Sequence, residues 1–164
     1  MAMYQLTSAD FTLENIRRVF FCVDGRLNRK RYIERFITVS IVCLVLALAV
    51  YYLAYFATGG DVRLASGVTV SVSVLETVSV YTLVQRRLHD LGYGRPVALV
   101  YLVYGLGQSV AGFFLEGLAP DSFPVFAYEV LTFAAMVFHL CLMGLRGVRG
   151  DNRYGVDPLG QPSV

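Results

Sequence analysis

Four long runs of apolar residues, separated by short polar segments, dominate the sequence. They span residues 36–57, 64–84, 96–115 and 123–145. A helix that crosses a bilayer needs roughly 20 predominantly apolar residues, and each run reaches about that length. The pattern therefore predicts an all-α membrane protein, a single domain over residues 1–164 with four transmembrane helices.

The second run has a different local pattern from the other three. Residues 68–74 read VTVSVSV, an alternation that is typical of a strand in a soluble protein. A lone strand in a bilayer would leave its backbone groups unpaired, so only a helix or a closed barrel can cross. We therefore predict a helix in which Ser and Thr hydroxyls donate to carbonyls one turn earlier.

Before the first run, residues 10–23 carry apolar side chains at helical spacing, and Asp10 stands where an N-cap is expected. This pattern predicts a short amphipathic helix. Two placements stay open for it. The helix either lies in the membrane interface, with its arginines near anionic headgroups, or packs beneath the bundle.

Positive charge is distributed unevenly between the two sides of the predicted bundle. Of the 14 Lys and Arg residues, all except Arg63 lie before the first run, between the second and third runs, or after the fourth. Short loops rich in Lys and Arg stay in the cytoplasm. We therefore expect both termini, including the tail at 146–164, on the cytoplasmic side.

The composition narrows the function classes. Apolar residues make up 56% of the chain and charged residues 16%, against about 45–50% and 25% in soluble domains. The net charge of +2 gives no reason to expect nucleic-acid binding. The chain contains no phosphate-binding glycine loop, zinc-protease motif or nucleophile elbow. We therefore predict no enzyme, cofactor or metal site. A membrane enzyme that uses His89 and Asp90 is the least favoured of three functional hypotheses.

Three segments lie next to the predicted membrane boundaries, at 25–32, 86–92 and 150–158, and together they bring Arg, Asn, His, Asp and Tyr residues to one side. Arginines at this depth hold lipid phosphates bidentately, or hold the segments together through acidic side chains. The turn and proline in the last segment favour a folded cap. The candidate residues for contact with anionic headgroups or a partner are Arg26, Arg29, Tyr32, Arg86, Arg87, His89, Asp90, Asn152, Arg153 and Tyr154.

These segments contain the patterns GR-x-x-R-x-x-Y, RRLHD-x-G and G-x-N-R-Y-G-x-D-P, in this order. Together they resemble the three signatures of the DUF805 family, a domain of unknown function. The resemblance spans residues 23–158. It implies a small multi-spanning protein of the bacterial inner membrane, and it implies no reaction. The signature positions are Gly25, Arg26, Arg29, Tyr32, Arg86, Arg87, Leu88, His89, Asp90, Asn152, Tyr154, Gly155 and Pro158.

The chain departs from this family where members usually follow the His-Asp pair with a tryptophan-containing stretch. Here residues 93–97 read YGRPV, and the chain contains no Trp. Tyr32 or Tyr93 would have to serve as the aromatic anchor at the interface instead.

Besides hydroxyl-bearing residues and cysteines, the predicted spans contain three ionisable side chains and one carboxamide: Glu76, Glu129, His139 and Gln108. Ionisable groups at this depth are costly to insert, which makes them functional candidates. We expect Glu76 and His139 to meet between the second and fourth spans, either in a structural hydrogen bond or in a site for protons or cations. Glu129 lies nearer the outer surface.

The third span carries small residues, including Gly105, Ser109 and Gly112, that allow helices to approach closely. They favour tight packing within the bundle or a homo-oligomer. The sequence thus supports a lipid- or partner-binding scaffold with a basic cytoplasmic cap. The alternative is a small transporter or channel, with the polar residues of the spans lining a pathway in an oligomer.

Overall fold

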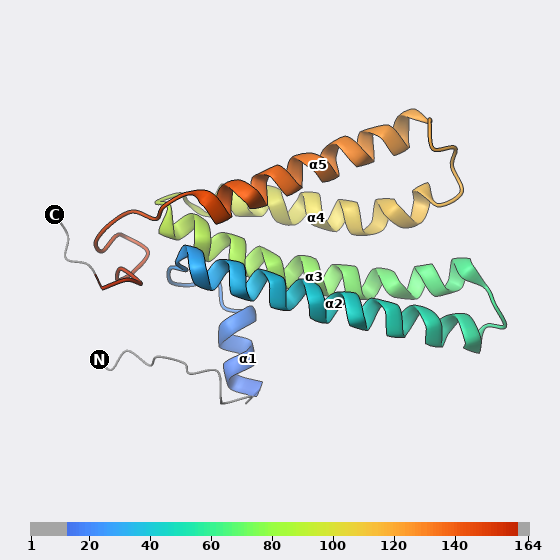
Figure 1. The fold of residues 1–164 in the computed structure, drawn as a ribbon, viewed down its shortest axis with the longest axis horizontal. Coiled ribbons are helices and arrows are strands. Elements are labelled where there is room, and N and C mark those ends of the chain that lie inside the picture. The colour runs from blue at the N-terminus through green and yellow to red at the C-terminus, as the bar shows by residue number, and fades with distance from the viewer. Residues whose placement is uncertain (1–12, 161–164) are drawn as a thin grey trace.

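The computed structural model describes residues 13–160, and in this range every regular element is a helix. A short helix, α1 (Leu13–Phe20), precedes four long ones. These are α2 (Arg29–Ala57), α3 (Val62–Asp90), α4 (Arg95–Leu115) and α5 (Phe123–Gly144). The four long helices run side by side, alternating in direction, and α1 crosses near one end of the bundle (Figure 1).

The four long helices confirm the predicted fold class, because each is long and apolar enough to cross a membrane. Their limits differ from the apolar runs. Helix α2 begins at Arg29, seven positions before the run, because Asn28 caps it by accepting a hydrogen bond from the Arg31 N–H at 2.9 Å. Helix α3 continues past the run to Asp90. Both extensions are polar helical turns that apolar length does not reveal.

The alternating segment of the second run lies within α3 and is helical, as predicted. Its hydroxyls donate to carbonyls of the preceding turn. Thr69 bonds the Ala65 carbonyl at 2.9 Å, and Ser71 bonds the Val68 carbonyl at 2.7 Å. Because the hydroxyls donate to carbonyls of their own helix, they need no hydrogen-bond partner outside it.

The predicted amphipathic helix is present as α1, although the proposed cap at Asp10 lies outside the described residues. The carboxyl end of α1 is attached to α3, where the Thr82 hydroxyl donates to the Phe20 carbonyl. At the other end Leu13 is exposed. The contact with α3 supports packing on the bundle for one end, while the exposed end leaves the interface placement open.

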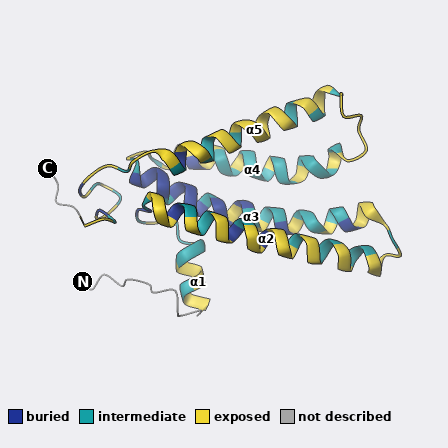
Figure 2. Ribbon diagram, in the orientation of Figure 1, coloured by how far each residue is buried: buried dark blue, intermediate teal, exposed yellow. Residues whose placement is uncertain are grey.

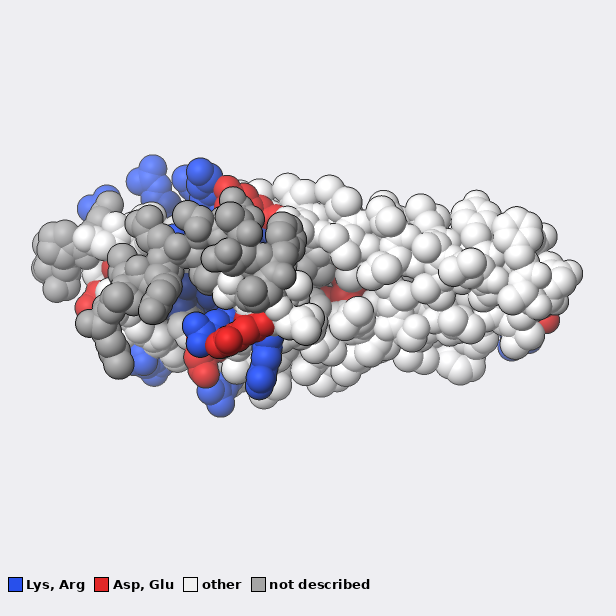
Figure 3. Space-filling model, turned by 90° about the horizontal axis from the view of Figure 1, so that it is seen from below, with Lys and Arg blue, Asp and Glu red and all other residues white. Residues whose placement is uncertain are grey.

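Helix α3 is the centre of the packing and contacts every other helix. Its buried residues concentrate towards its carboxyl end, from Thr77 to Asp90 (Figure 2). Charged side chains also gather at that end of the molecule, whereas the remaining length of the visible face is almost uncharged (Figure 3). We call this the basic end; it is where α3 and α5 finish and α2 and α4 begin.

Candidate functional site

At the basic end, Arg87 of α3 is completely buried. Its Nε donates to the Leu142 carbonyl at 2.9 Å, and its guanidinium also bonds the Leu145 carbonyl and the Asp90 carboxylate. A further bond reaches the Leu27 carbonyl at 3.4 Å. One arginine therefore joins the end of α3 to the end of α5 and to the segment that enters α2.

Arg26 completes the same cluster from the entry segment. Its Nη2 lies 3.0 Å from the Asp90 carboxylate, and its Nη1 donates to the Gly150 carbonyl at 2.6 Å. The Val148 N–H in turn donates to the Asp90 backbone carbonyl at 2.8 Å. We call Arg26, Arg87 and Asp90 the buried arginine cluster, and through it the three sequence motifs meet.

Gly147 shows how closely the tail approaches this cluster. A Cβ at this position would lie 2.6 Å from Cγ of Asp90, a separation that real Cβ atoms do not show. Only a glycine lets the backbone pass over the Asp90 carboxylate at this distance. The tail therefore packs closely against the end of α3 and forms part of a folded cap, as the tail motif predicted.

His89, Asn152 and Tyr154 form a second contact between α3 and the tail. The His89 ring stacks on Tyr154 with centroids 4.1 Å apart, and Asn152 donates to the His89 carbonyl at 3.0 Å. His89 Nδ1 also lies 3.1 Å from the Gly25 carbonyl, while its buried Nε2 has no hydrogen-bond partner within the described residues. Arg153 lies over the Tyr154 ring at 4.8 Å. These motif residues hold the tail in place.

Asp157 fixes the last turn of the described tail. Its carboxylate accepts hydrogen bonds from the backbone N–H groups of Leu159 and Gly150, both at 2.9 Å. These bonds, that of Leu159 foremost, hold the pKa of Asp157 below its ordinary value.

A second group of arginines at the basic end is exposed. Arg29, Arg146 and Arg149 surround a hollow of about 280 Å³ whose wall includes Gly147 and Val148. None of the three side chains has a hydrogen bond or ion pair within the described part of the chain. We call this hollow the arginine pocket. Arg86 differs from them, because it is half-buried and donates to the carbonyls of Arg18 and Val19 in α1.

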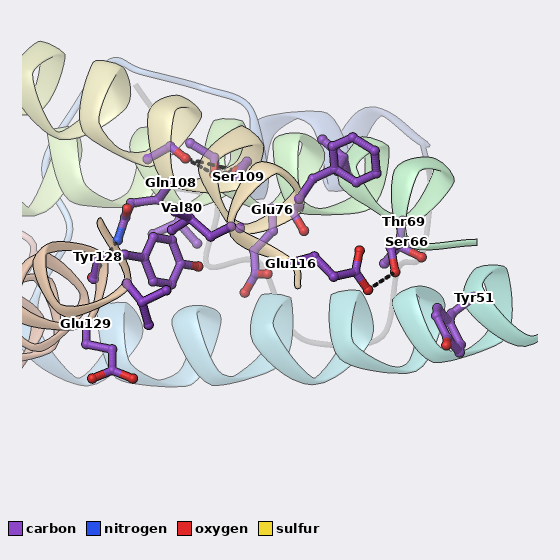
Figure 4. Close-up of a pocket in the computed structure, with 18 of the residues that line it drawn as sticks. Tyr51, Ser66, Thr69, Glu76, Val80, Gln108, Ser109, Glu116, Tyr128 and Glu129 are labelled. Carbon is purple, nitrogen blue, oxygen red and sulfur yellow. Dashed lines mark hydrogen bonds between the residues drawn. The ribbon is translucent and has the colours of Figure 1, made fainter. Parts of the chain in front are cut away.

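The predicted polar residues of the spans line a separate cavity, the interhelical crevice, of about 840 Å³ between the four long helices. Glu76, Gln108, Glu129 and His139 all border it. Figure 4 shows Glu76 among the labelled lining side chains, with the Ser66 hydroxyl donating to the Glu116 carboxylate at 3.1 Å nearby.

The predicted pairing of Glu76 with His139 is wrong. The imidazole uses both ring nitrogens elsewhere, because Nδ1 lies 2.8 Å from the Tyr32 hydroxyl and Nε2 lies 3.2 Å from the Tyr101 hydroxyl. Glu76 instead interacts with the Ser40 hydroxyl of α2. The Glu76 carboxyl and the His139 imidazole both border the crevice, but they do not bond each other.

The small residues of α4 pack within the chain. A Cβ on Gly105 would lie 2.7 Å from Cγ2 of Thr77, and the Ser109 hydroxyl shares a hydrogen bond with the Thr77 hydroxyl at 3.1 Å. A Cβ on Gly112 would contact the Tyr128 hydroxyl at 3.3 Å. The homo-oligomer stays a prediction, and these positions already have partners inside one chain.

Gln108 lies between α4 and α5 rather than free in the crevice. Its amide nitrogen donates to the Tyr104 hydroxyl and to Thr132 Oγ1, each at 2.8 Å. The Tyr104 hydroxyl donates to the Leu131 carbonyl at 2.9 Å. These bonds join α4 to α5.

Several site residues were not predicted from the sequence. Tyr101, which bonds His139, and Ser40, which interacts with Glu76, sit in apolar helices without a local motif. Arg146 and Arg149 looked like topology signals, and only the fold brings them to Arg29. Gly147 likewise has no local sequence signal, because the Asp90 carboxylate that excludes a Cβ there belongs to another helix.

Comparison with known proteins gives one family. A family model described as a protein of unknown function, DUF805, matches residues 20–156. No curated protein matches the chain, and no solved structure matches it.

Proposed function

The chain belongs to the DUF805 family of proteins of unknown function, and we propose that it is a lipid-binding scaffold of the bacterial inner membrane. In this proposal both termini lie in the cytoplasm and the basic end faces the anionic headgroups of the inner leaflet. No reaction is part of the proposal.

The division of the arginines into two sets is the observation that carries this proposal. Arg26 and Arg87 are buried, and their donors serve the protein itself. They are therefore structural in this proposal, unlike in the sequence-based expectation. Arg29, Arg146 and Arg149 are exposed at helix ends, where the boundary of a bilayer would lie.

Anionic lipid suits these exposed arginines for an electrostatic reason. Each Lys or Arg near an anionic leaflet contributes about 1 kcal/mol of attraction. Guanidinium groups also bind phosphate oxygens in a bidentate manner. The cap holds the arginines on a folded frame, so they lose less conformational freedom on binding than arginines on a flexible tail would.

Lipid retention tests this function. We expect the purified protein to retain anionic phospholipids in native mass spectrometry. Replacement of Arg29, Lys30, Arg31, Arg146 and Arg149 by Gln should lower that retention by about tenfold or more, given the contribution per charge. Arg63→Gln, at the opposite end of the bundle, is the control and should change nothing. Equal retention in all three proteins would contradict the proposal.

A second function is favoured by the interhelical crevice, whose lining of hydroxyl, amide and carboxyl groups would be costly in contact with lipid alone. We propose as the alternative that the crevice admits a small polar solute or ion. Ion flux through the reconstituted protein in liposomes, abolished in Glu76→Gln, would favour this alternative. The absence of flux in the wild-type protein would leave the scaffold as the better proposal.

A further inference from the structure

The arginine pocket brings together side chains that are far apart in the sequence. Arg29 comes from the first turn of α2, and Arg146 and Arg149 come from the segment that follows α5. Three guanidiniums around one hollow of about 280 Å³ concentrate positive charge there, and a hollow lined by one sign of charge attracts an anion. We propose that the pocket binds a phosphate monoester group.

The pocket is held open by the buried arginine cluster. Arg26 donates to the carbonyls of Val148 and Gly150, and the Val148 N–H donates to the Asp90 carbonyl. These bonds fix the backbone at residues 148 and 150, on either side of Arg149. Arg87 likewise bonds the Leu145 carbonyl, directly before Arg146. The two exposed arginines therefore project from a rigid segment, which reduces the entropic cost of binding an anion.

The two carboxylates that line the pocket do not cancel its charge. Asp90 is paired with Arg26 and Arg87 on its buried side. Asp157 accepts two backbone N–H groups, from Leu159 and Gly150. The groups left without a partner in the described chain are the three guanidiniums, and the positive end of the α2 dipole adds to their potential.

The number of guanidiniums favours a monoester over a diester. A phosphate monoester has three terminal oxygens and up to two negative charges, whereas a diester has two free oxygens and one charge. Arginine binds such oxygens in pairs. A water molecule occupies about 30 Å³ of liquid volume, so the pocket holds a phosphate and several further atoms. Phosphatidic acid and a soluble phosphate ester share this chemistry.

This inference rests on the proposed lipid-binding function for its membrane source, and the test separates the two. Native mass spectrometry of the detergent-solubilised protein would follow titration with phosphatidic acid, phosphatidylglycerol or glycerol 3-phosphate. We expect phosphatidic acid to bind about tenfold more tightly than phosphatidylglycerol, the ratio that one further charge-assisted hydrogen bond gives. Competition by glycerol 3-phosphate would identify the phosphate itself as the recognised group and a soluble ester as a possible source.

The triple variant R29Q/R146Q/R149Q should lose this preference and still fold, because these side chains make no contacts that hold the cap together. The control R17Q/R18Q/R95Q removes the same charge at exposed positions outside the pocket and should retain the preference. Equal binding of the two lipids by the wild type, or equal loss in both variants, would overturn the pocket. In either of those cases retention of both lipids would leave the scaffold function standing. Binding of glycerol 3-phosphate alone, without either lipid, would support the pocket and contradict the scaffold.

Discussion

The basic end and the interhelical crevice differ in how they accommodate polar groups inside an apolar bundle. At the basic end, Arg26, Arg87 and Asp90 are buried, and each is bonded to another member of the cluster or to backbone carbonyls. In the crevice, Glu76 and Glu129 border open space. In the first arrangement the charged groups bond one another and hold chain segments together. In the second, polar groups face a cavity.

This difference has a physical cause in the number of chain segments that converge. At the basic end the entry segment, the end of α3 and the tail supply carbonyls and a carboxylate around two guanidiniums. Further along the bundle only helices are present, and helix carbonyls are already used by their own backbone. Hydroxyl groups there donate a second hydrogen bond to such a carbonyl, as Thr69 does, or bond one another, as Thr77 and Ser109 do. The longer polar side chains border the crevice.

The substitution Asp90→Asn, at the basic end, has the largest expected effect. It leaves two buried guanidiniums without their counter-charge, and breaking a buried ion pair costs about 3–5 kcal/mol. We expect a loss of Tm on the order of 10 °C, or failure of the protein to accumulate. Thermal unfolding in detergent measures it.

Glu76→Gln is the matched control for Asp90→Asn, because it makes the same chemical change in the crevice. A hydrogen bond between membrane helices is worth about 0.6 kcal/mol on average, so Tm should stay nearly unchanged. Similar losses in the two variants would remove the distinction between a structural and an open polar region.

Gly147→Ala tests how closely the tail fits over the buried cluster. The new methyl group would lie against the Asp90 carboxylate, so the tail must move away or the cluster must deform. Overpacking of this kind costs about 1–3 kcal/mol. We expect a lower Tm and faster proteolysis of the tail.

Gly144→Ala, three positions earlier, has open space around the added methyl group and serves as the control. It lies within α5, where alanine is the better helix former, so its stability should be equal or slightly higher. If Gly147→Ala behaved like Gly144→Ala, the tail would not be packed against Asp90 in solution.

The sequence predicted the fold well, because transmembrane helices are determined by the length and hydrophobicity of local segments. Even the alternating segment in α3 followed from the rule that a lone strand cannot cross a bilayer. The motifs also indicated a folded cap, and the structure joins all three through Arg26, which bonds both the Asp90 carboxylate and the Gly150 carbonyl.

The partners within the site could not be predicted to the same degree. Periodicity places Glu76 and His139 on helix faces, but it does not say which residue of a neighbouring helix lies opposite. Tyr32 and Tyr101 took both nitrogens of His139, because the rotation and depth of α2 and α4 decide that contact. Likewise, the motif arginines looked like ligand contacts, although Arg26 and Arg87 hold the protein together and Arg146 and Arg149 outside the motifs face the pocket.

The smallest predicted effect concerns the tail at low pH. The N–H groups of Leu159 and Gly150 lower the pKa of Asp157 in the folded protein. The pKa of an Asp in an unfolded chain is about 3.9. Its contribution to tail stability is therefore complete above that pH and is lost as the pH falls through the lower, folded pKa. We expect amide exchange at Gly150 and Leu159, relative to the intrinsic rate at each pH, to increase as the pH falls below about 4. Asp157→Asn should show the faster exchange already at neutral pH and should abolish this step.

The crevice hydrogen bond between Thr77 and Ser109 involves no titrating group, so exchange in α4 should show no such step. A step in α4 as large as that in the tail would indicate global unfolding rather than release of the tail.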